Sequence, residues 1–353
     1  MKIKKIIICI ISIITFFSCI NVKLNKAYAQ DSTSEIVMDV KTNRILCGNN
    51  IHEKKYMAST TKILTAIVAI ENCNLEEKVT ITEKSIGVEG SSIYLEKGEI
   101  LSVKDLLYGL MLRSGNDCAV TLALHVSKSI ENFAVLMNEK AKEIGCLNSN
   151  FVNPHGLHND NHYTTAYDLA LISCYAIKNP IFKEISSTKS IRIPFTTRNT
   201  VRLLINKNKM LNSYDGATGI KTGYTKKAGR CLVTSAEKNG VELVSVVLNC
   251  SPMWEKSKEL LNSRFDTLKN IKIIESDHIL DFIPIKNKDE KIAIHVKNDV
   301  CLSLTDNEYK QLKIEYNYPK ELDNSISNEE NIGEIRFLLK NNLIFTEKIY
   351  TIL

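Results

Sequence analysis

The chain has 353 residues, of which 44% are hydrophobic and 24% charged, enough for one sizeable domain and a smaller one. Its formal net charge of +6 falls to +1 when a leader containing five lysines is removed, so the charge gives no support for a nucleic-acid partner. The ten cysteines include no C-x-x-C pair and no His/Cys cluster at zinc spacing, and we expect no metal and no cofactor.

The first residues have the pattern of a secretory signal peptide. Met1–Lys5 is basic, Ile6–Ile20 is apolar, and a small-x-small site ends at Ala29, so residues 1–29 are expected to be removed on export. An uncleaved anchor helix is the weaker alternative because the apolar run is short for a membrane span. A lipoprotein signal ending at Cys19 is weaker still, since the residues before it match poorly.

The cysteines beyond the leader are expected to be mostly buried thiols. In an exported protein they also invite disulfides, whose pairing a sequence does not give. Those in apolar surroundings are predicted to be free and to pack as small hydrophobes: Cys73, Cys118, Cys174, Cys231 and Cys250.

The first half of the exported chain is predicted to be helical after a short hairpin. Strands at Glu35–Asp39 and Ile45–Cys47 flank a turn at Lys41–Asn43. The helix containing Ile63–Ile70 is apolar on every side, which indicates burial. Further helices are expected at Val103–Leu112, Cys118–Ser127 and Phe133–Ile144, the last capped by Gly145.

The second half of this domain is predicted to supply most of the strands. Asn153–Leu157 has turn chemistry, and a helix begins near Thr165. Strands are expected at 191–195, 219–221, 230–236 and 241–248, before a helix at 255–268. Strands at both ends of a helical middle predict an α+β fold, in which one antiparallel sheet is covered by helices. The domain is expected to span residues 30–274.

Residues 275–353 are predicted to form a small all-β domain. Lys291–Val296 and Leu312–Tyr316 alternate, and Asn341-Asn342 joins Glu334–Lys340 to Leu343–Tyr350 as a hairpin. A sheet offers no broad apolar helical face, so the mature protein is expected in the extracellular or wall-associated fraction. Association with the outer face of the cytoplasmic membrane is left open.

A serine and a lysine three residues apart stand where the buried helix begins. In Ser59-Thr60-Thr61-Lys62, the spacing places the Lys62 amine beside the Ser59 hydroxyl. Burial and the nearby Lys221 cation are expected to lower the pKa of Lys62, which then acts as general base for the Ser59 nucleophile. A capping serine with a surface lysine is the weaker interpretation, because this helix has no polar face.

A second motif, Ser114-Gly115-Asn116, precedes the next predicted helix. The Ser114 hydroxyl is expected to relay a proton to the leaving amine, and the Asn116 amide to hold the Lys62 amine and a substrate carbonyl. Taken alone, these two residues are better explained as a helix N-cap.

The third motif, Lys221-Thr222-Gly223, lies in a predicted strand. Lys221 and Thr222 are expected to bind a substrate carboxylate, and Gly223 to let substrate backbone lie close. The backbone N–H groups of Tyr224 and Ser59 are the expected oxyanion donors. Without the other motifs, this segment is an ordinary strand-end turn.

The order of the motifs carries more weight than any one of them. Ser-x-x-Lys also occurs at Ser186/Lys189 and Ser235/Lys238, whereas Ser-x-Asn and Lys-Thr-Gly each occur once. The ordered set S-x-x-K, S-x-N, K-T-G is that of the penicillin-recognising serine enzymes.

The chain resembles the low-molecular-mass penicillin-binding proteins, specifically the serine-type D-alanyl-D-alanine carboxypeptidases, over roughly Thr33–Leu268. The resemblance extends to Gly90–Leu95, Asn153–Leu157, His162–Leu169 and Gly219–Thr225. It implies a β-lactamase/transpeptidase-like fold and removal of the terminal D-alanine from peptidoglycan stem peptides through an acyl-enzyme on Ser59. It also implies covalent inhibition by β-lactams.

Two departures from the family pattern concern substrate preference and anchorage. Many relatives have histidine where this chain has Tyr224, and many end in a membrane-binding amphipathic helix where this sequence still has a strand pattern.

Three rival functions share these residues. A class A β-lactamase needs a glutamate between the second and third motifs, and Ile144–Lys183 contains only Asp160 and Asp168 as acids. A DD-endopeptidase uses the same site and stays open. A non-enzymatic β-lactam sensor is less favoured, because no signalling membrane helix follows the leader.

Overall fold

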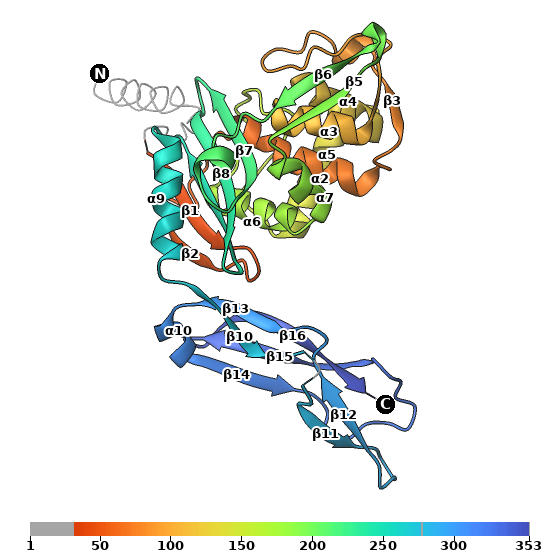
Figure 1. The fold of residues 1–353 in the computed structure, drawn as a ribbon, viewed down its shortest axis with the longest axis vertical. Helices are drawn as coiled ribbons and strands as arrows, with labels where there is room; N and C mark the ends of the chain where they lie inside the picture. Colours follow the sequence, from red (N-terminus) through yellow and green to blue (C-terminus); the bar gives the residue numbers. More distant parts are fainter. Residues whose placement is uncertain (1–31, 277, 353) are drawn as a thin grey trace, which may run out of the picture.

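The computed structural model describes residues 32–276 and 278–352, which form two units (Figure 1). The larger unit contains β1 to α9 and the smaller contains β10 to β16. An antiparallel sheet covered by helices, followed by a small β domain, confirms the predicted fold class. The predicted signal peptide lies outside the described residues.

The main sheet joins the two ends of the larger unit. Its strand order is β2-β1-β9-β8-β7, and every neighbouring pair is antiparallel. Ser34 near the start of this unit lies opposite Leu248 near its end. The strand with the third motif, β7, is at the edge of the sheet. The strands are β1 Ser34–Asp39, β2 Ile45–Asn49, β7 Ala217–Thr225, β8 Gly229–Lys238 and β9 Val241–Leu248.

Alternate residues of the sheet pack against helices on its two faces. In β1, Ile36 and Met38 join the large helical core, while Val37 joins a second core with residues of α9. Helix α6 contacts β1 and β9, whereas α9 contacts β8 and β9. The helices are η1 Ala58–Thr61, α2 Lys62–Asn72, η2 Glu83–Ser85, α3 Val103–Leu112, α4 Asn116–Ser127, α5 Ile130–Ile144, α6 Ala166–Ile177, α7 Pro180–Ser187, η3 Thr196–Arg198, α8 Met210–Ser213 and α9 Met253–Phe265.

Local sequence signals explain where the helices near the site begin and end. Ser102 and Asp105 form a reciprocal capping box at the start of α3. Gly145 ends α5 in the left-handed region at φ +98°. Eight of the eleven residues of α2 are buried, as its apolar sequence predicted, and Lys62 is one of them.

Two pairs of antiparallel strands extend from the helical side of the larger unit, away from the smaller unit in Figure 1. They pair β3 Lys78–Thr80 with β4 Ile100–Ser102, and β5 Ser190–Phe195 with β6 Thr200–Ile205.

The smaller unit consists of two sheets around one core. One sheet has the order β11-β12-β16-β15-β14, and the other pairs β10 with β13. Leu302 of β13 and Phe337 of β15 belong to the same buried cluster, so the two sheets share their interior. The elements are β10 Lys269–Ile274, β11 Asp281–Pro284, β12 Lys291–His295, β13 Val300–Leu304, α10 Asp306–Lys310, β14 Leu312–Asn317, β15 Asn331–Leu339 and β16 Asn342–Ile352.

Strand pairing corrects two predicted boundaries. Lys269 of β10 pairs with Leu304 of β13, so the smaller unit begins just before Lys269 rather than after Ile274. Lys340 and Asn341 have positive φ angles of 51° and 65° and form the two-residue turn between β15 and β16. The turn therefore lies one residue before the predicted position, Asn341-Asn342. Among the described helices, none has both the length and the apolarity to cross a membrane.

The two units contact each other through the β1–β2 turn. Arg44 forms an ion pair with Glu308 and donates to the carbonyl oxygen of Ser303 at 2.7 Å. Lys41 Nζ lies 5.0 Å from the centre of the Phe345 ring.

Candidate active site

The first motif lies where a short 3₁₀ turn becomes the buried helix. Ser59 belongs to η1, and Lys62 is the first residue of α2. Lys62 Nζ lies 3.1 Å from Ser59 Oγ, and the Lys62 side chain is fully buried. The predicted pairing of amine and hydroxyl is therefore present.

Two further oxygens surround the Lys62 amine. Asn116 Oδ1 and the backbone oxygen of His155 each lie 2.6 Å from Nζ. Neither oxygen carries a hydrogen, so both act only as acceptors. A neutral amine that donates its two N–H groups to Asn116 and His155 keeps its lone pair for the Ser59 hydroxyl. The geometry suits a base that faces a single proton donor.

Burial and charge also favour the neutral amine. Burial lowers the pKa of Lys62 well below the usual value for lysine, and the positive charge of Lys221 lowers this pKa further. Both causes were expected from the apolar helix and the third motif. They move Lys62 towards the protonation state that a general base requires.

The Asn116 amide is oriented by a loop carbonyl that no sequence motif predicted. Asn116 Nδ2 donates to the backbone oxygen of Glu89, which leaves Oδ1 facing Lys62. Gly90 permits this approach, because a Cβ there would lie 2.7 Å from Asn116 Nδ2. Lys62 thus engages the amide oxygen and Glu89 accepts one of the two Nδ2 hydrogens, so the expected contact with a substrate carbonyl would use the second Nδ2 hydrogen.

The loop at 153–157 supplies the other acceptor for Lys62. Gly156, at φ +86°, lies so close to η1 that a Cβ would come 1.9 Å from the Ala58 oxygen. Asn153 Oδ1 accepts the Gly156 N–H at 2.7 Å, and Thr65 Oγ1 donates to the Pro154 oxygen at 2.7 Å. The turn was predicted from its sequence, but its position against the first motif was not.

The lysine of the third motif is buried rather than open to the cavity. Lys221 is 2% exposed, and its Nζ donates to the Thr222 oxygen at 3.0 Å. Burial, and then the charge of Lys207, lower the pKa of Lys221 to about 7. Lys221 is therefore a neighbour of Lys62, and the charge of Lys221 itself changes near neutral pH.

Gly223 is needed for the packing of β7 against the turn that contains Ser59. A Cβ on Gly223 would lie 3.0 Å from both the Met57 oxygen and the Ser59 nitrogen. The close approach that this glycine permits in the structure is between β7 and η1, whereas the predicted close approach was that of substrate backbone. It brings the edge strand, including Tyr224, beside Ser59.

A cavity of about 300 Å³ opens beside Ser59. Its described lining contains two cationic side chains, Lys207 and Arg230, and no acidic one. Lys207 Nζ donates to Ser91 Oγ at 3.1 Å. Arg230 of β8 lies opposite Tyr224 of β7, with its guanidinium 5.7 Å from the tyrosine ring. The lining residues are Ser59, Ser91, Ser114, Lys207, Thr222, Gly223, Tyr224, Arg230, Met253 and Trp254.

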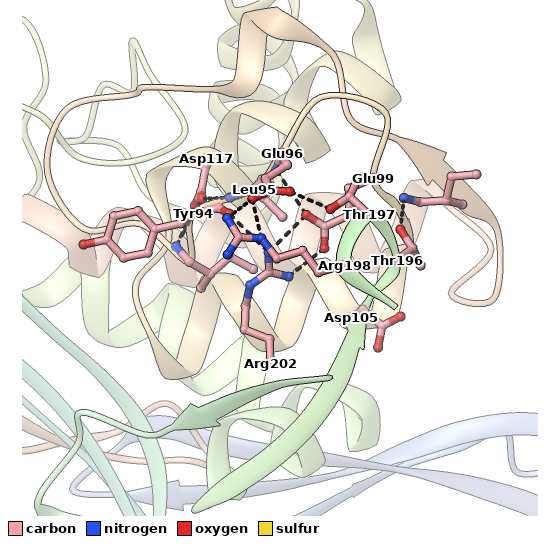
Figure 2. Close-up of polar contacts among 12 residues, drawn as sticks. Tyr94, Leu95, Glu96, Glu99, Asp105, Asp117, Thr196, Thr197, Arg198 and Arg202 are labelled. Atoms are coloured by element: carbon pink, nitrogen blue, oxygen red, sulfur yellow. Dashed lines mark hydrogen bonds and ion pairs between the residues drawn. The ribbon is translucent and has the colours of Figure 1, made fainter. Parts of the chain in front are cut away.

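An arginine–carboxylate pair holds the loop formed by residues 91–99, whose Ser91 lines the cavity (Figure 2). Arg202 of β6 donates to the two Glu99 oxygens at 2.6 and 3.1 Å, and to the Tyr94 carbonyl at 3.1 Å. Glu99 is fully buried. Arg198 contacts Glu96 in the same cluster. These pairs attach the loop to the β5–β6 hairpin.

The residue after Asn116 holds the same loop from the other side. The buried Asp117 carboxylate accepts the backbone N–H groups of Ile93 and Leu95, each at 3.1 Å. The Ser91 carbonyl in turn accepts the Asn116 N–H at 2.7 Å. Asp117 and Ser91 were not predicted, although Asp117 adjoins the second motif and Ser91 lies in a segment that carried the family resemblance.

The structure brings Ser59, Lys62 and Asn116 into direct contact and places Ser114, Thr222, Gly223 and Tyr224 at the same cavity or beside it. Of the predicted site residues, Lys221 is close to Lys62 but is not among the described lining residues. Lys207 and Arg230 are additional lining residues, and no spacing rule marks either one.

The cysteines of the described residues are all free thiols. Four of the five that were predicted to be buried are buried, while Cys73 is half-buried. Within residues 32–276 and 278–352, no group of three His, Cys, Asp or Glu side chains is placed to hold a metal ion.

The family described as D-alanyl-D-alanine carboxypeptidase matches residues 21–251, which include all three motifs. The chain belongs to this family. Residues 268–352 match the family described as penicillin-binding protein 5, C-terminal domain, in agreement with the boundary set by β10.

Relatives within the family share about a third of the aligned residues. The carboxypeptidase DacF of Bacillus subtilis is 34% identical over 245 residues, which are 67% of this chain and 62% of that protein. DacD of Salmonella typhimurium is 29% identical over 334 residues, covering 90% and 84% of the two chains. Penicillin-binding protein 5 from Haemophilus influenzae superimposes with a TM-score of 0.73 at 28% identity, over 90% of this chain and 96% of that one.

Proposed function

We propose that this protein is a serine-type D-alanyl-D-alanine carboxypeptidase that removes the terminal D-alanine of peptidoglycan pentapeptide stems through an acyl-enzyme on Ser59. The arrangement around Lys62 carries this proposal: its amine faces the Ser59 hydroxyl at 3.1 Å while two acceptors occupy its other positions. Family membership supports the substrate class, since the matching family is described as D-alanyl-D-alanine carboxypeptidase.

Acylation begins when Lys62 takes the Ser59 proton. Ser59 Oγ then attacks the carbonyl carbon of the peptide bond between the last two residues of the substrate. The carbonyl oxygen becomes an oxyanion held by the backbone N–H groups of Ser59 and Tyr224. The C–N bond breaks as the leaving D-alanine amine receives the proton from Lys62 through the Ser114 hydroxyl. A water deprotonated by the same lysine then attacks the ester carbonyl, the bond to Ser59 Oγ breaks, and Oγ receives the proton from Lys62 as the shortened peptide leaves. β-Lactams acylate Ser59 by the same first step.

The substrate carboxylate is expected to meet the cationic lining of the cavity. Thr222, Lys207 and Arg230 all line it, whereas Lys221 is buried with a pKa lowered to about 7. We therefore assign direct carboxylate contacts to Thr222 and these two cations. Lys221 then acts mainly through the electrostatic effect of its positive charge on Lys62 and on the bound carboxylate.

The two acids considered for a β-lactamase are engaged elsewhere. Asp168 accepts from Ser149 Oγ at 2.7 Å and from the Asn148 N–H at 2.8 Å. Asp160 is 87% exposed and lies 3.3 Å from His158 Nε2. Neither is among the described residues lining the cavity beside Ser59, which disfavours either acid as the base for rapid lactam hydrolysis.

Reaction with a synthetic pentapeptide tests the carboxypeptidase proposal. The purified protein is expected to release many equivalents of D-alanine per enzyme and to leave the tetrapeptide. Stoichiometric acylation without free D-alanine would instead identify a sensor. Cleavage of a cross-linked dimer in preference to the pentapeptide would identify an endopeptidase. Recovery of the protein outside the cytoplasm, starting at Gln30, tests the proposed export.

A further inference from the structure

A buried histidine outside the three motifs contacts the turn that carries the nucleophile. His162 is 2% exposed, and its Nε2 lies 2.7 Å from Thr61 Oγ1. Thr61 stands in the sequence between Ser59 and Lys62, so this contact reaches the segment that joins nucleophile and base. The mechanism proposed above does not use His162.

The hydrogen bonds of the ring determine its tautomer. The Val152 N–H donates to Nδ1 at 3.0 Å, so Nδ1 has no hydrogen. The hydrogen of the neutral ring is therefore on Nε2, which donates to Thr61 Oγ1. Burial lowers the pKa of His162 to about 3, and the ring stays neutral at ordinary pH.

The hydroxyl of Thr61 connects His162 to the turn that bears Ser59. Having accepted from His162, it donates to the Ala58 carbonyl oxygen at 2.8 Å. Ala58 immediately precedes the nucleophile and has an unusual positive φ of 48°. A chain of two hydrogen bonds thus runs from His162 through Thr61 to Ala58 at the start of η1.

The loop around His162 has other attachments that do not involve Nε2. Lys55 and Thr164 exchange backbone hydrogen bonds at 2.7 and 2.9 Å, and Asn150 and Tyr163 exchange another pair at 2.9 and 3.0 Å. The bond from Nε2 to Thr61 is consequently separable from the anchoring of the loop itself.

We propose that His162 is a positioning residue for acylation, which fixes the turn bearing Ser59 by orienting the Thr61 hydroxyl towards Ala58. This inference rests on the proposed acyl-enzyme function and adds to it a residue that contacts neither the substrate nor the reacting atoms. The hydrogen-bond donor at position 162 supports the Ser59–Lys62 geometry on which the rate of acylation depends.

The test compares His162→Phe, His162→Gln, Thr61→Val and the double variant His162→Phe/Thr61→Val. His158→Phe is the control, because His158 lies in the same loop and packs edge-on against Tyr56. Each protein is titrated with a fluorescent penicillin for acylation rate and with a pentapeptide for kcat and KM. Thermal melting reports changes in stability separately.

Loss of the donor is expected to slow acylation and lower kcat roughly tenfold or more, with little change in KM, because small misplacements of reacting groups are costly. His162→Gln, which retains an N–H donor, should recover most of the rate. His162→Phe should cause little further loss in the Thr61→Val background.

Two results would overturn the inference while leaving the proposed function intact. One is wild-type acylation in His162→Phe. The other is an equal loss from His162→Phe in the wild-type protein and in the Thr61→Val variant. If His162→Phe does not fold, a wild-type acylation rate in Thr61→Val overturns it. Failure of the wild-type protein to react with penicillin would contradict the proposed function instead.

Discussion

Gly156 lies against the carbonyl oxygen of Ala58, and the neighbouring His155 oxygen lies 2.6 Å from the Lys62 amine. A Cβ at position 156 would be 1.9 Å from the Ala58 oxygen, and the backbone has φ +86°. Two requirements therefore coincide at one residue: a left-handed conformation and the absence of a side chain. The loop at 153–157 and the turn bearing Ser59 therefore pack directly against each other.

Gly156→Ala is expected to lower both stability and acylation. Left-handed strain alone costs about 1–3 kcal/mol, and the clash with Ala58 adds to it. Gly145→Ala is the matched control, since Gly145 also has a positive φ, +98°, but has no neighbouring atom within 4 Å of its Cβ position. Denaturant unfolding should show a larger loss for Gly156→Ala, and only this variant should acylate slowly. Equal behaviour of the two variants would contradict the assigned contact.

Replacement of Lys62 tests the identity of the base. Lys62→Arg should reduce the acylation rate by roughly 10²–10⁴-fold, because a guanidinium stays protonated and cannot accept the serine proton. Lys238→Arg is the control, as Lys238 ends another Ser-x-x-K and lies over the Tyr214 ring, a contact that arginine can keep. Rapid labelling of Lys62→Arg by penicillin would remove Lys62 from the mechanism.

The pH dependence of acylation should respond to Lys221. Lys62 reacts as the neutral amine, so the rate rises as pH increases through the pKa of Lys62. Removing Lys221 removes a charge that lowers this pKa. The pKa of Lys62 should therefore rise in Lys221→Ala, and the acid limb of the rate profile should move to higher pH. Lys226→Ala, an exposed change in the β7–β8 turn, should leave the limb in place. An unmoved limb in Lys221→Ala would show that the lysines are not coupled.

Carboxylate recognition should depend on the two cations that line the cavity. Arg230→Gln and Lys207→Gln are each expected to lower kcat/KM for a pentapeptide, which corresponds to an activation free energy raised by about 1–2 kcal/mol. The corresponding C-terminal amide lacks the charge and should show a much smaller change. Equal losses with acid and amide would remove these side chains from carboxylate binding.

A chain ending at Leu268 tests the independence of the larger unit. Such a chain removes the smaller unit without cutting β10, and all three motifs remain. Penicillin acylation should persist, while the lost contacts of Arg44 with Glu308 and Ser303 should lower the melting temperature. Loss of acylation in a folded truncated protein would show that the smaller unit supports the site.

Periodicity identified much of the fold because burial and strand pairing leave strong local patterns. Val103–Leu112 and Val241–Leu248 have the predicted bounds, and the all-apolar run after Lys62 forms the buried helix. The boundary after Ile274 was wrong because β10 is assigned to the smaller unit only by pairing with the distant β13. A linear pattern contains no such information.

The candidate site was predicted as far as its motifs extend. Ser59, Lys62 and Asn116 form a contacting set, but the two backbone carbonyls that orient them come from Glu89 and His155. Backbone groups are common to all residues and leave no signature of residue type. The burial of Lys221 likewise depends on tertiary packing, whereas the apolar sequence after Lys62 was enough to predict that burial of Lys62 lowers its pKa.

Covalent labelling of Ser59 tests the central claim most directly. Wild-type protein and Ser59→Ala are incubated with penicillin, analysed by intact mass, and digested to locate the adduct, after matching melting curves show that both are folded. The account predicts one added penicillin on the wild-type peptide containing Ser59 and none on Ser59→Ala. An adduct at another residue, or undiminished labelling of Ser59→Ala, would contradict the assignment of Ser59 as the nucleophile.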